Sequence, residues 1–245
     1  MYSKALAGVF TILLFAVLAI APSLGQQQFV PKTLDQHPDL AEIVSNMEQA
    51  HAEDMLRTPA YVMTRDYRFF GSDEQRAKSE VIAEINFVPP HAKTYRIDKV
   101  EGNERGKMVV QRVLNGEAAA ASDHPSAAIS RANYDFSLQG ADVVDGRLCW
   151  ILGLRPKRDE KSLIVGSAWV DQETYRVHRV EGDMAKSPSW WVKRVHTTAT
   201  FEDVQGLWLQ TGTRAVADVR IIGRHTLVGQ VTKVETAHQV AFLPR

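Results

Sequence analysis

The chain of 245 residues carries 29 basic and 29 acidic residues, so its formal net charge at neutral pH is zero. This balance excludes the strong overall positive charge with which many proteins attract nucleic acids, and the length is sufficient for one domain with a sizeable core. The single cysteine, Cys149, excludes a disulfide within the chain, and we expect it to pack as a small hydrophobic residue.

The first 25 residues have the composition of a secretory signal peptide. Lys4 gives a positive start, residues 5–21 are almost entirely apolar, and Pro-Ser-Leu-Gly follows at residues 22–25. The alternative is a permanent membrane anchor, for which the apolar run is slightly short. We therefore predict cleavage before Gln26, a periplasmic location, and a single β-rich domain over residues 26–245.

The first element predicted after the signal peptide is a helix. Pro38 suits a first helical turn, and apolar residues then recur at helical spacing from Leu40 to Ala50. Thr58-Pro59 predicts an end near Arg57, because a residue that precedes proline avoids the helical conformation. The apolar stripe of this helix requires a surface to cover.

Three strands with alternating apolar residues follow the helix. They are expected over residues 61–70, 81–87 and 93–101, with a turn at residues 71–73 and a break at Pro89-Pro90. Strands of this kind, joined by short connections, predict an antiparallel meander.

Residues 102–131 interrupt the strands with helical patterns. Met108, Val109 and Val113 have helical spacing, and the alanines at 118–121 are strong helix formers. Asn115-Gly116 is a point where the segment can divide, and Pro125 argues against a continuous helix beyond it. We consider two roles for this segment, a lid over the sheet and a packing helix.

Residues 146–182 predict a second antiparallel meander. Its first strand has one wholly apolar face, formed by Leu148, Trp150, Leu152 and Leu154. Two further strands are expected over residues 163–170 and 175–181. The charged run at residues 155–161 joins the first two strands, either as a solvated hairpin loop or as a contact for anionic lipid head groups.

Four more strands are predicted over residues 190–202, 207–216, 218–229 and 230–241. The pattern as a whole predicts an α+β fold, in which an open, strongly curved antiparallel sheet forms an incomplete barrel covered by helices. A β-sandwich is the alternative.

The sequence contains no pattern that indicates catalysis or metal binding. No two histidines are four residues apart, and G-x-S-x-G, H-E-x-x-H and a glycine-rich phosphate loop are absent. His178, His196 and His225 lie on different predicted strands, and we interpret them as surface or hydrogen-bonded residues. We therefore expect no enzyme activity, no metal and no cofactor.

Five short motifs carry a resemblance to a known group. These are residues 133–136 (Asn-Tyr-Asp-Phe), 146–150 (Gly-Arg-Leu-Cys-Trp), 154–158 (Leu-Arg-Pro-Lys-Arg), 169–171 (Trp-Val-Asp) and 179–182 (Arg-Val-Glu-Gly). Together with the signal sequence, the N-terminal helix and the meanders, they resemble the LolA/LolB-type periplasmic carrier superfamily. That superfamily includes outer-membrane lipoprotein-sorting-like proteins and regulators of the MucB/RseB kind.

The resemblance covers most of residues 40–240 and implies an incomplete barrel with an apolar cavity for acyl chains. One departure concerns the arginine that precedes a proline in the lipoprotein carrier and helps to control its lid. The corresponding place here reads Phe87-Val88-Pro89-Pro90, without an arginine.

The function that the sequence predicts is periplasmic, non-enzymatic binding or transport of a lipid, a lipoprotein acyl chain or another apolar ligand, with transient membrane contact and no nucleic-acid partner. The candidate lining residues are Tyr61, Met63, Tyr67, Val81, Ile85, Phe87, Tyr95, Trp150 and Leu152. Each of them equally fits a closed core packed against the helices. The alternative function is an envelope sensor or scaffold that binds a protein partner, as the resemblance to the regulators implies.

Overall fold

The computed structural model describes residues 38–237 and 240–243, which all fall within one compact unit, His37–Arg245. The signal peptide predicted for residues 1–25 and its cleavage site lie outside the described residues. The expectation of a single domain over residues 26–245 stays a prediction.

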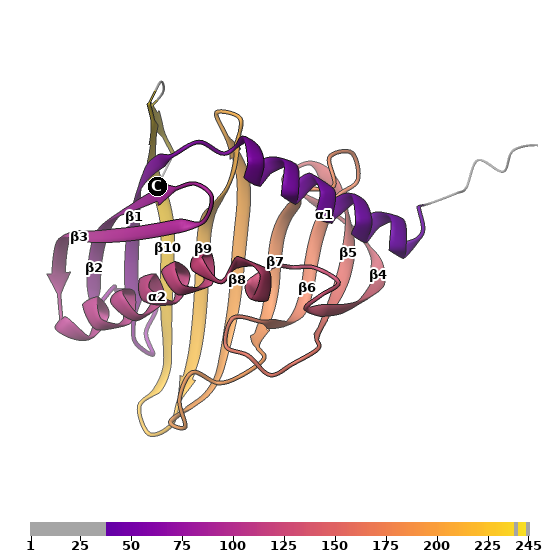
Figure 1. The fold of residues 1–245 in the computed structure, drawn as a ribbon. Coiled ribbons are helices and arrows are strands. Elements are labelled where there is room, and N and C mark those ends of the chain that lie inside the picture. Colours follow the sequence, from indigo (N-terminus) through magenta and orange to yellow (C-terminus); the bar gives the residue numbers. More distant parts are fainter. Residues whose placement is uncertain (1–37, 238–239, 244–245) are drawn as a thin grey trace, which may run out of the picture. The chain divides into compact units, whose positions relative to one another are not determined.

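The unit combines an 11-stranded antiparallel sheet with three helices (Figure 1). The helices are α1 (Leu40–Arg57), α2 (Glu104–Ser122) and α3 (His124–Ala127). The strands are β1 (Tyr61–Phe70), β2 (Ser79–Val88), β3 (Ala92–Gly102), β4 (Tyr134–Val144), β5 (Arg147–Pro156), β6 (Ile164–Asp171), β7 (Val177–Met184), β8 (Val192–Val204), β9 (Leu207–Val219), β10 (Gly223–Thr236) and β11 (Val240–Phe242).

The strand order places the two edges of the sheet far apart. It runs β3-β2-β1-β10-β9-β8-β7-β6-β5-β4, with β11 paired to β10. The edge strands β3 and β4 do not pair with each other, so the sheet is open, and the predicted fold of an open antiparallel sheet covered by helices is confirmed.

The strand order also explains the position of α2. Strands β3 and β4 are consecutive in the sequence but lie at opposite edges, so the connection between them has to cross one face of the sheet. Helix α2 lies in this connection, and Figure 1 shows it in front of the same face that α1 covers.

Helix α1 agrees closely with its sequence pattern. The Asp39 side chain accepts a hydrogen bond from the Glu42 N–H at 2.7 Å and caps the N-terminus. The helix therefore begins at Leu40, and Pro38 precedes the cap instead of lying in the first turn. It ends at Arg57, as predicted from Thr58-Pro59.

Each of the two long helices covers its own part of the core. The α2 core is formed by α2 together with β1, β2, β9, β10 and the end of β8, and its buried residues include Tyr67, Val81 and Leu114. The α1 core comprises Ile43, Val44 and Met47 of α1 with Trp150, Leu152 and Val170 of β5 and β6. A third cluster continues the α1 side and consists of Tyr134, Leu154, Leu163, Ala168 and Val180.

Three of the strand predictions are wrong in their bounds. The strand expected from residue 190 begins at Val192, because a turn closed by the Val192 N–H on the Ser189 carbonyl leaves the preceding tryptophans in a loop. The two strands expected over residues 218–229 and 230–241 form one continuous strand, β10, followed by the short β11.

Two local expectations from residue type are also corrected. Leu148 was expected on the buried face of β5, yet 53% of it is exposed, next to the exposed Val143 that pairs with it on β4. Helix α2 continues through Asn115-Gly116 without a break. The Asn115 side chain there accepts a hydrogen bond from the Tyr95 hydroxyl at 2.7 Å, which offsets the poor helix propensity of the pair.

Candidate functional site

A carboxylate continues the buried stripe of helix α2. Gly106, Val110 and Leu114 are buried and follow each other at four-residue spacing, which places them on one face of the helix. Glu117 comes three residues later on the same face, and only 23% of its side chain is exposed. Its carboxylate therefore lies where an amphipathic helix normally carries an apolar residue.

A cation occupies the matching position on the sheet. The alternate residues of β1 from Tyr61 to Phe69 are buried in the α2 core, and Arg65 lies in the middle of this row with 3% of its side chain exposed. The pairing of β1 with β10 shifts register between Thr64 and Arg65. Such an irregularity locally re-aims a side chain.

Arg65 and Glu117 form a buried ion pair. The Arg65 Nη1 donates to the two carboxylate oxygens of Glu117 at 2.8 and 3.1 Å, and to the Tyr67 hydroxyl at 3.0 Å. Burial opposes the charge of Arg65, but the attraction of Glu117 and Tyr67 outweighs it and raises the pKa of Arg65. Arg65 therefore stays charged inside an apolar core.

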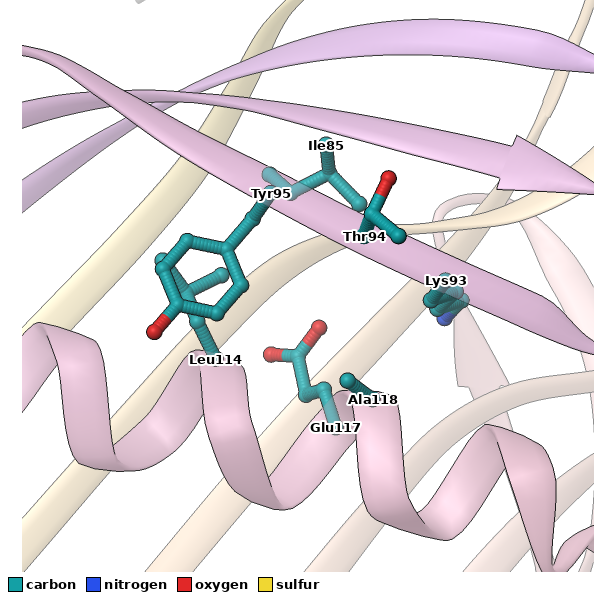
Figure 2. Close-up of a pocket in the computed structure, with 7 residues that line it drawn as sticks. All are labelled: Ile85, Lys93, Thr94, Tyr95, Leu114, Glu117 and Ala118. Carbon is teal, nitrogen blue, oxygen red and sulfur yellow. The ribbon is translucent and has the colours of Figure 1, made fainter.

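A second basic side chain, Lys93, lies nearby on β3. Lys93 is half-buried and shares its row on β3 with Tyr95 and Ile97. Burial lowers the pKa of Lys93, Arg65 lowers it further, and Glu117 opposes the shift. Figure 2 shows the Glu117 carboxylate directed from α2 toward β3, between Tyr95 and Lys93. Two basic side chains thus lie near one carboxylate beneath α2.

A small cavity adjoins these charges between α2 and β2–β3. Its volume is about 10 Å³, and it is lined by Ile85, Lys93, Thr94, Tyr95, Leu114, Glu117 and Ala118 (Figure 2). A space of this size holds about one water molecule. In the observed position of α2, the cavity is therefore too small for an acyl chain.

Tight packing holds Tyr67 beside the ion pair. Gly229 lies opposite Tyr67 on β10, and a Cβ atom at this position would come within 2.8 Å of the Tyr67 ring. Burial raises the pKa of Tyr67, and it raises the pKa of Tyr61 to about 12. Both hydroxyls are therefore neutral at physiological pH.

The N-terminal end of α2 is anchored to the sheet. The Asn103 side chain caps the helix by accepting from the Gly106 N–H at 3.1 Å, and the Ser79 hydroxyl donates to the Asn103 carbonyl at 2.7 Å. A Cβ atom on Gly106 would clash with the Ser79 side chain, so this glycine permits the close approach of α2 to β2. The Glu117 ion pair lies farther along the helix.

The structure divides the nine residues that the sequence proposed as a ligand surface. Tyr61, Met63, Tyr67, Val81, Ile85 and Phe87 are buried together in the α2 core, and the half-buried Tyr95 packs against them. Trp150 and Leu152 lie apart from these, beneath α1. Among the nine, Ile85 and Tyr95 line the cavity.

Sequence reasoning missed the three charged residues of the site. The sequence does show Arg65 as a charged residue within an otherwise apolar alternating row. It also shows Glu117 as a charged residue on the apolar stripe of a helix. Their pairing was not visible, because they are 52 residues apart.

Other features singled out in the sequence have structural explanations. Cys149 is buried as expected, and burial raises the pKa of its thiol to about 11. In the basic run, Arg158 donates to the Asn133 side chain at 2.7 Å and to the Ser126 carbonyl at 2.6 Å, which fastens the loop to the segment around α3.

Within the described ranges, no three His, Cys, Asp or Glu side chains are grouped so that they could hold a metal ion. Across the same residues, none of the helices combines the length and apolarity needed to cross a membrane.

No family model and no curated protein matches the chain. Solved structures do match. A domain described as an outer membrane lipoprotein-sorting protein from Vibrio parahaemolyticus is 11% identical, with 78% of this chain and 91% of that chain covered and a TM-score of 0.46. A LolA superfamily protein from Nitrosomonas europaea is 14% identical, with coverage of 82% and 94% and a TM-score of 0.37.

The MucA/MucB complex of Pseudomonas aeruginosa also matches, at 12% identity, with 77% of this chain and 93% of that chain covered and a TM-score of 0.26. At these identities and TM-scores, the similarity to these structures does not indicate which ligand or partner this chain binds. The solved structures that this chain is similar to thus include the groups that its sequence resembles.

Proposed function

We propose that this protein is a non-enzymatic periplasmic binding protein, which takes an apolar ligand with an anionic head group between α2 and the face of the sheet that α2 covers. A lipid or a lipoprotein acyl chain next to an acidic group is a ligand of this class. The observation that carries the proposal is the burial of Arg65 and Glu117 within the apolar α2 core.

A buried ion pair is a poor way to stabilise a core. The free energy lost when two charges are removed from water is about as large as the free energy gained from their attraction. Replacing a buried ion pair by apolar residues of similar size is therefore often neutral or stabilising. The Arg65–Glu117 pair occupies a position where apolar side chains would satisfy folding alone. This supports a role for the charges in binding.

The balance of charge supports an anionic head group. Arg65 and Lys93 are two basic side chains beside the single carboxylate of Glu117, and burial favours the uncharged form of Lys93. One further anion would favour the charged form of Lys93 and give each basic group an acidic partner. The surrounding apolar and aromatic side chains of the α2 core, among them Met63, Ile85 and Phe87, provide the environment for an acyl chain.

Ligand entry requires α2 to move, because the cavity holds about one water molecule. The cap formed by Asn103 and Ser79 fixes the beginning of α2, whereas the Glu117 ion pair holds it farther along. An anionic head group that replaces the Glu117 carboxylate at Arg65 would release this second attachment. This is the lid role considered for residues 102–131.

The test combines identification and binding. Native mass spectrometry of protein purified from the periplasm should show a co-purifying lipid, and titration calorimetry should show that oleate binds more tightly than oleyl alcohol. Lys93→Gln should weaken oleate binding, whereas Arg96→Gln, an exposed change on the same strand, should leave it unchanged. Protein that is ligand-free and binds neither compound would refute the proposal.

A second candidate function is supported by the edge strand β4. It pairs with β5 alone among the described strands, and it exposes Leu138 and Val143. An extended segment of a partner protein can add to such an edge. A stoichiometric envelope protein captured without lipid, and lost in a Leu138→Lys variant, would favour a sensor or scaffold over a lipid-binding protein.

A further inference from the structure

Large apolar side chains protrude from two loops at one end of the sheet. Trp190, 84% exposed, and the exposed Trp191 lie between β7 and β8, while Ile221, at 102%, and the exposed Ile222 lie between β9 and β10. Figure 1 shows both loops at the same end of the sheet. We call these four residues the Trp–Ile tip.

Hydrogen bonds join the two loops of the tip. The Arg220 backbone N–H donates to the Trp191 carbonyl at 2.8 Å, and the Arg220 Nε donates to the Trp190 carbonyl at 3.0 Å. Arg220 thereby uses its backbone and its side chain to hold the tryptophan loop against the isoleucine turn. The four apolar side chains therefore belong to one surface.

The backbone at the tip is strained. Ile221 has φ +77°, a conformation that β-branched residues rarely adopt. Glycine or asparagine at this position would avoid the strain. The chain thus combines an unfavourable backbone conformation with a fully exposed isoleucine, and neither contributes to folding. Strain of this kind concentrates at functional sites.

Basic residues surround the tip. Lys186, Lys193, Arg194, Arg220 and Arg224 are exposed on the two loops and the adjoining strand ends. The acidic residues there are Asp183, which contacts Arg194, and Asp218, which contacts Arg194 and Arg224. The adjoining β1–β2 loop adds Asp73 and Glu74 but also Arg76 and Lys78, so the excess of positive charge remains.

We propose that the Trp–Ile tip docks on the surface of an anionic lipid bilayer. Tryptophan rings favour the head-group level of a membrane, and the isoleucines can enter the acyl boundary below it. Lysine and arginine near the surface add attraction to anionic lipids. Because the chain as a whole is neutral, this local positive charge gives the complementarity that selects an anionic surface. The inference does not depend on a ligand beneath α2.

The test is flotation of the full chain with vesicles. Vesicles of phosphatidylethanolamine and phosphatidylglycerol should carry the protein, and neutral phosphatidylcholine vesicles should carry at least about tenfold less. Trp190→Ser combined with Ile221→Gly should reduce binding by at least about tenfold. This variant should fold normally, because both side chains are exposed and glycine relieves the strain at residue 221.

Leu56→Ser is the matched control, because Leu56 is equally exposed on α1 but lies outside the tip. It should bind vesicles as the wild type does, and a thermal melt should verify that each variant is folded. Lys193→Gln combined with Arg220→Gln should weaken binding and reduce its sensitivity to salt. Equal flotation of the wild type and the Trp190→Ser/Ile221→Gly variant, or no flotation of the wild type with anionic vesicles, would overturn the proposal.

Discussion

The two long helices cover the same face of the sheet but are attached to it in different ways. Helix α1 buries only apolar side chains against Trp150 and Leu152, and its ion pairs lie at the edge of this contact. Arg176 donates to the Asp54 carboxylate at 2.8 and 2.6 Å, and Arg131 donates to Glu48 at 2.7 Å. Helix α2 instead places a carboxylate beneath itself, against a buried guanidinium.

The contrast between the two helices shows that the exposure of an ion pair to water decides how much the pair contributes to stability. At the edge of α1, water still reaches the guanidinium groups, since 55% of the Arg131 side chain and 27% of the Arg176 side chain are exposed, so these pairs cost less and contribute less. Beneath α2, the Arg65 guanidinium is only 3% exposed and has lost its water, so leaving it without Glu117 is costly. We infer that α1 is a packing helix and that α2 is the helix whose position a ligand can change.

The largest effect is expected for Trp150→Ala in the α1 core. Trp150 is buried and lies 5.3 Å from the Tyr175 ring, measured between ring centroids. Truncation of such a side chain costs about 3–5 kcal/mol, because it leaves a cavity. Urea unfolding should show this loss, while oleate affinity of the folded fraction stays unchanged. Altered oleate affinity in folded protein would place Trp150 in the ligand surface and remove the distinction between the two helices.

A slightly smaller loss is expected for Glu117→Gln in the α2 core. It leaves the Arg65 charge buried beside a neutral amide and should cost about 3 kcal/mol, the lower end for a broken buried pair, because Glu117 is partly exposed. The double change Arg65→Met and Glu117→Leu should recover most of that stability but not oleate binding. A double variant as unstable as Glu117→Gln would mean that the pair stabilises the fold and would contradict a binding role.

The ion pair at the edge of α1 gives the counterpart measurement. Arg131→Ala should lower the free energy of unfolding by about 1 kcal/mol or less, because its ion pair with Glu48 is open to water, with 55% of the Arg131 side chain and 27% of the Glu48 side chain exposed. The difference from the wild type should shrink as salt is added, because salt screens exposed charges. A loss as large as that of Glu117→Gln, measured by the same urea unfolding, would show that the two ion pairs do not differ as proposed.

The smallest effect is a dependence of stability on alkaline pH that belongs to Lys93. The folded state lowers the pKa of Lys93, so the unfolded chain binds more protons between the folded pKa and the ordinary value of about 10.4. Stability of the wild type should therefore rise with pH across that window, relative to Lys93→Met. Urea unfolding of both proteins between neutral pH and pH of about 10 tests this. Parallel curves would show that Lys93 is not desolvated beneath α2.

Some elements were fully readable from the sequence, because their physical cause is local. The alternation at residues 61–70 predicted β1 with its bounds, and the apolar stripe with Thr58-Pro59 predicted the end of α1. Strand β4 was not predicted, although Tyr134, Phe136 and Leu138 alternate with polar residues, because the alternation ends at Gly140 and most of this edge strand is exposed. Trp190 and Trp191 were placed in a strand on propensity, whereas a turn holds them in a loop.

The sequence alone determined which side chains share a face, since alternation and helical spacing are properties of the backbone. Only the tertiary structure decided what covers each face. Trp150 lies beneath α1 and Ile85 beneath α2, although both belong to apolar rows of the same kind. Arg65 meets Glu117 because the connection from β3 to β4 has to cross the sheet, and that follows from the order of the strands, which no local pattern records.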